Sequence, residues 1–154
     1  MRFTAWLPEH RATSKEIAML PHDLWAGYYD FVYEQAFGRC YRDLTDLTLR
    51  TIAGLHQPPC AVVDFGAGTG RLSVPLAAAG YVVTAIEPSG PMLDVLQKKA
   101  RAAGVRIDSR AGRMQDCALP ADYDIALCLF TTISYLLDED SLAAGLRCAS
   151  AAGC

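Results

Sequence analysis

Residues 62–88 read VVDFGAGTGRLSVPLAAAGYVVTAIEP, and the other predicted elements are arranged around this stretch. Residues 61–65 are almost wholly apolar, which predicts a short strand buried on both faces within a parallel sheet. Three alternate glycines follow the strand directly: Gly66, Gly68 and Gly70. Because glycine has no Cβ and tolerates positive φ, we expect a tight turn there that lets a ligand lie against bare main chain.

The second half of the stretch predicts a helix and another strand. We expect the helix over residues 69–79, ended by Gly80, and a β-branched strand over residues 81–86. This strand delivers Glu87 to the same end of the sheet as the glycine turn. A carboxylate there can accept hydrogen bonds from both hydroxyls of a ribose, so the stretch predicts a nucleoside pocket.

The glycine spacing narrows the choice of nucleoside. A dinucleotide turn, G-x-G-x-x-G, requires glycine at position 71, and Arg71 stands there, which disfavours a nicotinamide-dependent oxidoreductase. The pattern D-x-G-x-G-x-G that begins at Asp64, followed by Glu87, resembles motif I and the acidic ribose site of the class I S-adenosylmethionine-dependent methyltransferases of small molecules. The resemblance implies S-adenosyl-L-methionine as the cofactor and a small-molecule acceptor that is methylated on O, N or C.

The resemblance also implies a fold. It is α/β, with a Rossmann-like, doubly wound and mostly parallel sheet of which this chain supplies strands 1 to 4, preceded by N-terminal helices. We expect residues 1–57 to form an N-terminal helical arm or lid and residues 58–154 to form the cofactor-binding core. Apolar periodicity and turn residues predict the remaining elements: helices over residues 41–54, 91–103 and 142–149, and strands over residues 105–110 and 123–130.

Several residues match the family's cofactor site by their place in its motifs. The resemblance implies these cofactor-binding residues: Asp64, Gly66, Ala67, Gly68, Gly70, Glu87, Pro88, Met92, Met114, Phe130 and Tyr28. Tyr28, Tyr29 and Asp30 match a Tyr-Asp element that closes over the cofactor in relatives, although an aromatic stretch is also typical of core packing. Met92 fits a core position equally well. No general base and no set of metal ligands is predicted.

The segment after residue 130 lies where open α/β sheets bind ligands. The resemblance implies that Phe130 and Thr131 contact the methionine part of the cofactor, while Ser134 and Tyr135 face the acceptor. An incidental polar loop is the alternative. Three isolated histidines have no partners at metal-ligand spacing and are expected in loops or on the surface: His10, His22 and His56.

The chain departs from the family at Arg113. Relatives carry an aspartate there that accepts a hydrogen bond from the adenine amino group, whereas a guanidinium can only donate. We therefore expect either that Asp116 substitutes or that backbone and apolar contacts alone hold the adenine. The loss of one such hydrogen bond would cost about 1–2 kcal/mol, which weakens cofactor binding without excluding it.

The sequence ends shortly after the helix expected over residues 142–149. The family's domain continues with further strands, so the fourth strand would be a sheet edge with an uncovered apolar face, which invites pairing with another chain. We therefore expect either self-association through this strand or a truncated product. A non-catalytic cofactor-binding or interaction module is the alternative to an active enzyme.

Composition limits which binding partners and which cellular compartment can be expected. The 154 residues carry a net charge of −3 and no basic run, so neither a nucleic acid nor a membrane surface is expected as a partner. The six cysteines form no C-x-x-C pair and several fall in apolar segments, which predicts reduced core thiols. With no signal peptide and no membrane-spanning apolar run, we expect a cytoplasmic protein.

Overall fold

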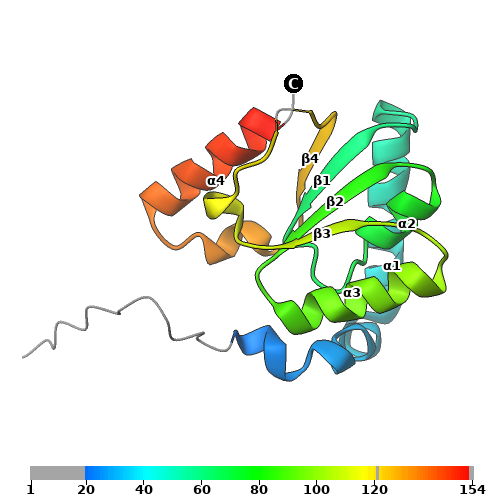
Figure 1. The fold of residues 1–154 in the computed structure, drawn as a ribbon. Coiled ribbons are helices and arrows are strands. Elements are labelled where there is room, and N and C mark those ends of the chain that lie inside the picture. Colours follow the sequence, from blue (N-terminus) through cyan, green and yellow to red (C-terminus); the bar gives the residue numbers. More distant parts are fainter. Residues whose placement is uncertain (1–19, 121, 153–154) are drawn as a thin grey trace, which may run out of the picture.

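A computed structural model describes residues 20–120 and 122–152, so the first part of the predicted arm lies outside the described residues. Four parallel strands form one sheet: β1 (Ala61–Phe65), β2 (Val82–Glu87), β3 (Asp108–Ala111) and β4 (Ile125–Cys128). Their order is β3-β2-β1-β4, which confirms the predicted α/β, Rossmann-like parallel sheet (Figure 1). The division into an arm of residues 1–57 and a core of residues 58–154 stays a prediction.

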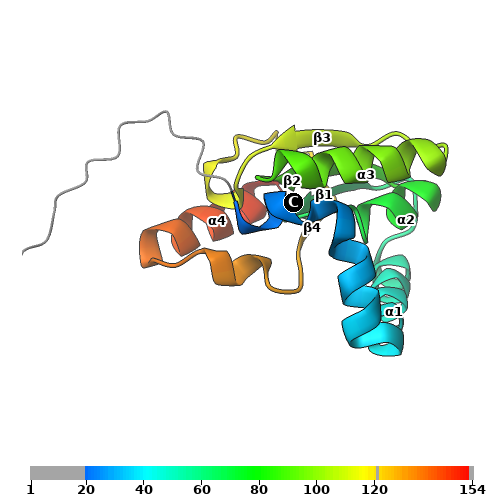
Figure 2. The same ribbon diagram turned by 90° about the horizontal axis from the view of Figure 1, so that it is seen from below.

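Helices cover both faces of the sheet, as Figures 1 and 2 show from two directions. One face carries three helices: α1 (Tyr29–Leu55), α2 (Ser73–Ala78) and α3 (Gly90–Ala102). The other face carries α4 (Glu139–Ala152) and the short 3-10 helix η3 (Met114–Asp116). Three more 3-10 helices flank these elements: η1 (Pro21–Leu24), η2 (Ala26–Tyr28) and η4 (Thr132–Tyr135).

Alternating side chains of β1 enter two cores, as expected for a strand covered on both faces. Val62 packs in the core under α2 and α3, whereas Val63 and Phe65 pack in the core under η3 and α4. Parallel pairing places Phe65 beside Ile86 of β2. The glycine turn that follows β1 therefore lies beside Glu87, the last residue of β2.

Glycines account for the main differences between the predicted and observed helices. α1 includes the helix predicted over residues 41–54, but it begins at Tyr29 and kinks at Gly38, where φ is +45°. α2 begins only at Ser73 because Gly70 takes a φ of +82°, outside the helical range. β3 and β4 are shorter than predicted, and α4 is longer.

β4 lies at one edge of the sheet and, among the described residues, pairs only with β1. Its side chains pack on both faces, with Leu127 in the core under α2 and α3 and Cys128 in the core under α4. Both faces of β4 are therefore partly covered in the described residues, where Leu127 is buried and the other residues of the strand are half-buried. One hydrogen-bonding edge of β4 has no strand partner among them, and self-association through it stays a prediction.

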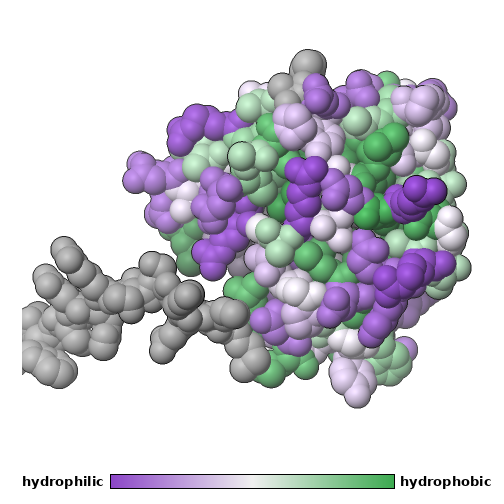
Figure 3. Space-filling view, in the orientation of Figure 1, coloured by the Kyte–Doolittle hydropathy of each residue, from purple (hydrophilic) through white to green (hydrophobic). Residues whose placement is uncertain are grey.

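The surface seen in Figure 3 mixes hydrophilic and hydrophobic residues. Five free cysteines are described, of which Cys40 is exposed and the others are half-buried, so the prediction of core thiols holds only in part. Cys154 lies outside the described residues. None of the helices in the described part of the chain combines the length and the hydropathy that crossing a membrane requires.

Candidate functional site

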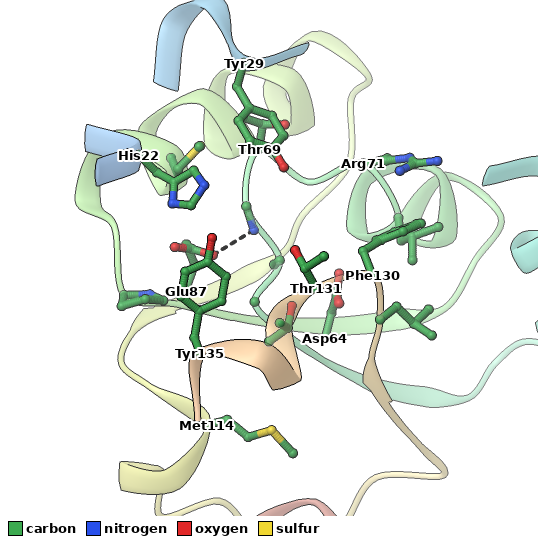
Figure 4. A pocket seen from close by; sticks show the side chains of 18 of the residues that line it. His22, Tyr29, Asp64, Thr69, Arg71, Glu87, Met114, Phe130, Thr131 and Tyr135 are labelled. Carbon is green, nitrogen blue, oxygen red and sulfur yellow. Dashed lines mark hydrogen bonds between the residues drawn. The ribbon is translucent and has the colours of Figure 1, made fainter. Parts of the chain in front are cut away.

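A cavity of about 800 Å³ opens at the carboxyl ends of β1, β2 and β4, where open α/β sheets bind their ligands. The glycine turn, η1, the first part of α1 and the segment after β4 all contribute to its wall (Figure 4). Most of the predicted cofactor-binding residues line this cavity: Asp64, Gly66, Ala67, Gly68, Glu87, Pro88, Met92, Met114 and Phe130.

Gly70 and Tyr28 are the two predicted cofactor-binding residues that do not line the cavity, and Ser134, which was expected to face the acceptor, does not line it either. Gly70 has a packing role, because a Cβ at this position would stand only 2.8 Å from Leu96 Cγ on α3. Tyr28 ends η2 and is 71% exposed, whereas Tyr29, the first residue of α1, lines the cavity. Successive residues leave a helix in different directions, so Tyr29 replaces Tyr28 as the candidate from the Tyr-Asp element.

Glu87 is held in place by two main-chain donors. Its carboxylate accepts a hydrogen bond from the N–H of Gly68, at 2.9 Å, on one oxygen (Figure 4). The other oxygen accepts a hydrogen bond from the N–H of Ser89, at 3.0 Å. Burial raises the pKa of Glu87, which is 8% exposed, and the two N–H groups act in the opposite direction. Each oxygen keeps a lone pair, so the fixed carboxylate can still accept hydrogen bonds from a ligand.

The glycine turn brings main chain to the cavity surface. Gly66 and Gly68 have φ values of +71° and +54°, which other residues rarely adopt. A Cβ at Gly66 would overlap the side chain of Thr132, whose own Cβ would lie 3.0 Å away, whereas a Cβ at Gly68 would meet no heavy atom within 4 Å. The absence of a side chain at Gly66 therefore allows the segment after β4 to pack against the turn, and its absence at Gly68 leaves space for a ligand.

Asp64 lies beneath the turn and is 4% exposed. It accepts a 2.6 Å hydrogen bond from the hydroxyl of Ser73, the first residue of α2. Burial raises the pKa of Asp64 to about 6, with Ser73 lowering it and Glu87 raising it further. The cavity wall thus includes a carboxyl group that gains its negative charge near pH 6.

Hydrogen bonds tie the N-terminal segment to the core beside the cavity. The carboxylate of Asp30 accepts hydrogen bonds from the Thr69 hydroxyl, at 2.6 Å, and from the Lys99 ammonium of α3, at 2.9 Å. Asp23 of η1 accepts another from the hydroxyl of Ser89, which is also the N-cap of α3. These bonds hold η1 and the start of α1 against the glycine turn and α3. Asp30 was already part of the predicted Tyr-Asp element, but its partners were not predicted.

Aromatic rings form another wall of the cavity. Tyr29 and Tyr33 stack with centroids 4.4 Å apart, and the His22 ring lies 5.9 Å from both Tyr29 and Tyr135. The aromatic stretch is therefore a site element as well as packing. His22 carries little sequence signal, because an isolated histidine has no ligand spacing. Within the described residues, no three His, Cys, Asp or Glu side chains gather in a way that could hold a metal ion.

The segment after β3 lines the part of the cavity that the resemblance assigns to adenine. Met92 and Met114 are buried there, and Arg113 and Gln115 line the cavity beside them. Asp116 does not line it, which removes the support for Asp116 as a substitute for the missing aspartate. Gln115 was not predicted from the sequence, although its amide can both accept and donate hydrogen bonds.

Arg71 also lines the cavity and was not predicted as a site residue, because its place in the motif indicates only that the third glycine of a dinucleotide turn is missing. Its guanidinium carbon lies 3.5 Å from the ring centroid of Tyr41 and 4.0 Å from that of Phe130. Phe130 is the only non-glycine residue with positive φ, +58°, in the described part of the chain. Such backbone strain clusters at functional sites.

Comparison with known proteins identifies a matching family and several similar proteins. A family model described as a methyltransferase domain matches residues 62–152. The magnesium-protoporphyrin O-methyltransferase of Synechocystis is 35% identical over 91 residues, 58% of this chain and 40% of that protein. The cypemycin N-terminal methyltransferase of Streptomyces is 32% identical over 124 residues, 75% of this chain and 49% of that protein. The chain spans about half the length, or less, of these curated relatives.

A solved structure shows the same fold. The magnesium protoporphyrin IX methyltransferase of Synechocystis, crystallised with bound S-adenosylhomocysteine, has a TM-score of 0.69 at 20% sequence identity. The match covers 82% of this chain and 62% of that one. Because only 20% of the aligned residues are identical, this match shows a shared fold, the sheet with its flanking helices, and nothing more.

Proposed function

Because this chain belongs to the methyltransferase domain family, we propose that its cavity binds S-adenosyl-L-methionine and that it transfers a methyl group to a small-molecule acceptor. The observation that carries the proposal is the fixed carboxylate of Glu87 beside the open main chain of Gly68. One relative is named as an O-methyltransferase and another as an N-terminal methyltransferase, so kinship leaves the accepting atom open among O, N and C. Neither is named as a non-catalytic module, which favours the enzyme over that alternative.

The described residues fit this cofactor. Glu87 offers two hydrogen-bond acceptors to ribose hydroxyls, and Gly68 leaves bare main chain beside it. The buried side chains of Met92 and Met114 suit an adenine ring, and the amide of Gln115 can pair with its polar edge. The cavity, about 800 Å³, lies in the usual range for small-molecule sites.

The chemistry divides between the cofactor and the chain. The cofactor, when bound, supplies a methyl group on a positively charged sulfonium. The chain contributes by binding the two reactants in line and by excluding water. Glu87 and the glycine turn would hold the nucleoside, while the rings of Tyr29, Tyr33 and Tyr135, which line the same cavity, would surround the acceptor and present π faces that favour a nearby cation. No side chain is assigned here as the base that removes an acceptor proton.

A small-molecule acceptor suits a cavity whose wall is largely apolar and aromatic.

Self-association through the free edge of β4 and a cytoplasmic location stay predictions. Sedimentation velocity at increasing protein concentration tests the first of them. A single monomeric species at every concentration would contradict pairing through β4.

Titration calorimetry with S-adenosylhomocysteine tests the proposed function. We expect micromolar binding by the wild-type chain and a loss of about tenfold or more in Glu87→Ala. Asp116→Ala is a matched control, because this exposed acid follows β3 without lining the cavity and should bind as the wild type does. The absence of binding by a folded wild-type chain would contradict the proposal.

A further inference from the structure

A row of aromatic rings lies along one face of α1. Its members recur at every fourth residue, a spacing that places side chains on the same face of a helix: Tyr29, Tyr33, Phe37 and Tyr41. Tyr29 stacks on Tyr33 with ring centroids 4.4 Å apart, and the Tyr33 centroid lies 5.4 Å from that of Phe37. It also lies 5.5 Å from the centroid of Tyr41, so the row continues past the kink at Gly38. All four residues of this aromatic row line the cavity.

Aromatic side chains from the segment after β4 line the same cavity. Phe130 and Tyr135 belong to this segment. The guanidinium of Arg71 covers part of the Phe130 ring, with its carbon 4.0 Å from the ring centroid, yet 46% of Phe130 remains exposed. Tyr135 is 59% exposed, and Phe37 of the aromatic row is 57% exposed. Large apolar side chains that stay this exposed within a cavity are typical of a ligand site, because the ligand buries them.

The aromatic part of the cavity is continuous with the part that contains Glu87. Figure 4 shows Glu87 and Phe130 on opposite sides of the site, with Asp64 between them. In S-adenosyl-L-methionine, a single carbon joins the sulfonium to the ribose ring. A cofactor whose ribose lies at Glu87 would therefore carry its methyl group inside the cavity, where a molecule held by the aromatic rings can reach it.

The rings favour one class of ligand over others. Aromatic rings interact with one another in offset-stacked or edge-to-face arrangements, and this interaction adds to the gain from burying apolar area. An alkyl chain or a saturated ring gains only from the burial. Tyr33 and Phe37 offer ring contacts from α1, and Phe130 offers them from the segment after β4. The two walls together therefore suit a flat aromatic molecule better than an aliphatic one.

We propose that the methyl acceptor is a flat aromatic compound that binds between the aromatic row of α1 and Phe130, and this inference rests on the proposed function. Tyr33 and Phe37 contact the acceptor from one side, and Phe130 contacts it from the other. The accepting atom faces the part of the cavity that contains Glu87. An alkyl chain and a saturated ring are the other occupants that an apolar wall admits, and binding experiments separate all three.

Titration calorimetry with three hydroxyl compounds tests the inference. The flat compound is 2-naphthol, decahydro-2-naphthol has the same carbon skeleton with saturated rings, and 1-octanol is a linear alcohol. Each compound is titrated into the chain saturated with S-adenosylhomocysteine. We expect the wild type to bind 2-naphthol about fivefold or more tightly than either aliphatic compound, because it alone gains ring contacts.

Substitutions in the aromatic row identify the rings responsible. Phe37→Leu and Tyr33→Leu keep an apolar side chain but remove a ring, so each should reduce the preference for 2-naphthol by about threefold, whereas Tyr33→Phe should keep it. Phe31→Leu is the matched control, because this exposed aromatic residue of α1 does not line the cavity. Should Tyr33→Leu fail to fold, Phe37→Leu gives the same comparison, since more than half of Phe37 is exposed.

Two results would overturn the inference. One is a wild type that binds the three compounds equally or prefers an aliphatic one, which would mean that the cavity binds apolar groups of any shape. The other is a preference for 2-naphthol that persists in folded Phe37→Leu and Tyr33→Leu, because the rings of α1 would then not produce it. Failure of the proposed function looks different: the wild type would bind no S-adenosylhomocysteine, whereas titration of the free chain would still measure its preference among the three compounds.

Discussion

The amide of Gly68 donates a 2.9 Å hydrogen bond to the carboxylate of Glu87, 19 residues further along the chain. The two groups meet because β1 and β2 pair in parallel, so the turn after one strand lies beside the last residue of the other. The bond joins the main chain that would face a nucleoside to the acid that would hold its ribose. The fold therefore orients both groups before a ligand binds, which reduces the cost of ordering them on binding.

Gly66→Ala is predicted to destabilise the protein by about 2–4 kcal/mol, because an unfavourable positive φ and overlap with Thr132 add together. Gly68→Ala has a similar φ but no neighbour to displace, and its expected cost is about 1–2 kcal/mol. Urea unfolding of both variants measures the difference. Equal losses would show that Thr132 moves aside without cost.

The stabilising contribution of Asp64 is predicted to fall as the pH rises from about 4 to about 6. Burial raises the folded-state pKa of Asp64 from 3.8 to about 6, so the folded chain keeps a proton over this range that the unfolded chain releases. The contribution of Asp64 is complete below pH 4 and lost above pH 6, by roughly 3 kcal/mol at most. Urea unfolding across this range measures it.

Asp64→Asn is the control for that pH dependence. The amide oxygen can still accept the hydrogen bond from Ser73, but the side chain no longer titrates. The variant should therefore lose less stability than the wild type between pH 4 and pH 7. Parallel pH profiles for the two proteins would mean that the pKa of Asp64 is not raised.

Asp30→Ala is predicted to release the start of α1 from the glycine turn. The substitution removes the carboxylate that accepts hydrogen bonds from Thr69 and Lys99. Because the side chains of Lys99 and Asp30 are both partly exposed, water weakens their ion pair, and the expected loss of stability is about 1 kcal/mol. Amide hydrogen exchange should become faster in η1 and the first turns of α1. Asp43→Ala, which breaks an exposed ion pair with Arg39 on the same helix, is the comparison. Similar exchange in both variants would argue against Asp30 as the anchor.

The parts of the fold that depend on local pattern could be predicted from the sequence. β1 has its predicted bounds, because a short apolar run before a glycine turn has few other solutions. Glu87 lies where expected, because parallel strands carry their last residues to one edge. The bounds of α1 were harder, since a single left-handed glycine, Gly38, sits inside a helix that continues past it.

Contacts between distant segments could not be predicted. Asp30 and Lys99 are 69 residues apart, and nothing in either segment indicates the other. The choice between Tyr28 and Tyr29 depends on the residue at which α1 begins, which sequence patterns place only roughly. The contact between the Arg71 guanidinium and the Phe130 ring involves a residue with a left-handed backbone, a conformation that is uncommon outside glycine.

The most direct test of the site is whether Glu87 binds the ribose. Dissociation constants are measured for S-adenosylhomocysteine and its 2′-deoxy analogue with the wild type and with Glu87→Ala. We predict that the wild type prefers the hydroxyl-bearing ligand by about tenfold or more, and that Glu87→Ala binds both ligands equally weakly. Equal affinity of the wild type for the two ligands would contradict a ribose-binding role for Glu87.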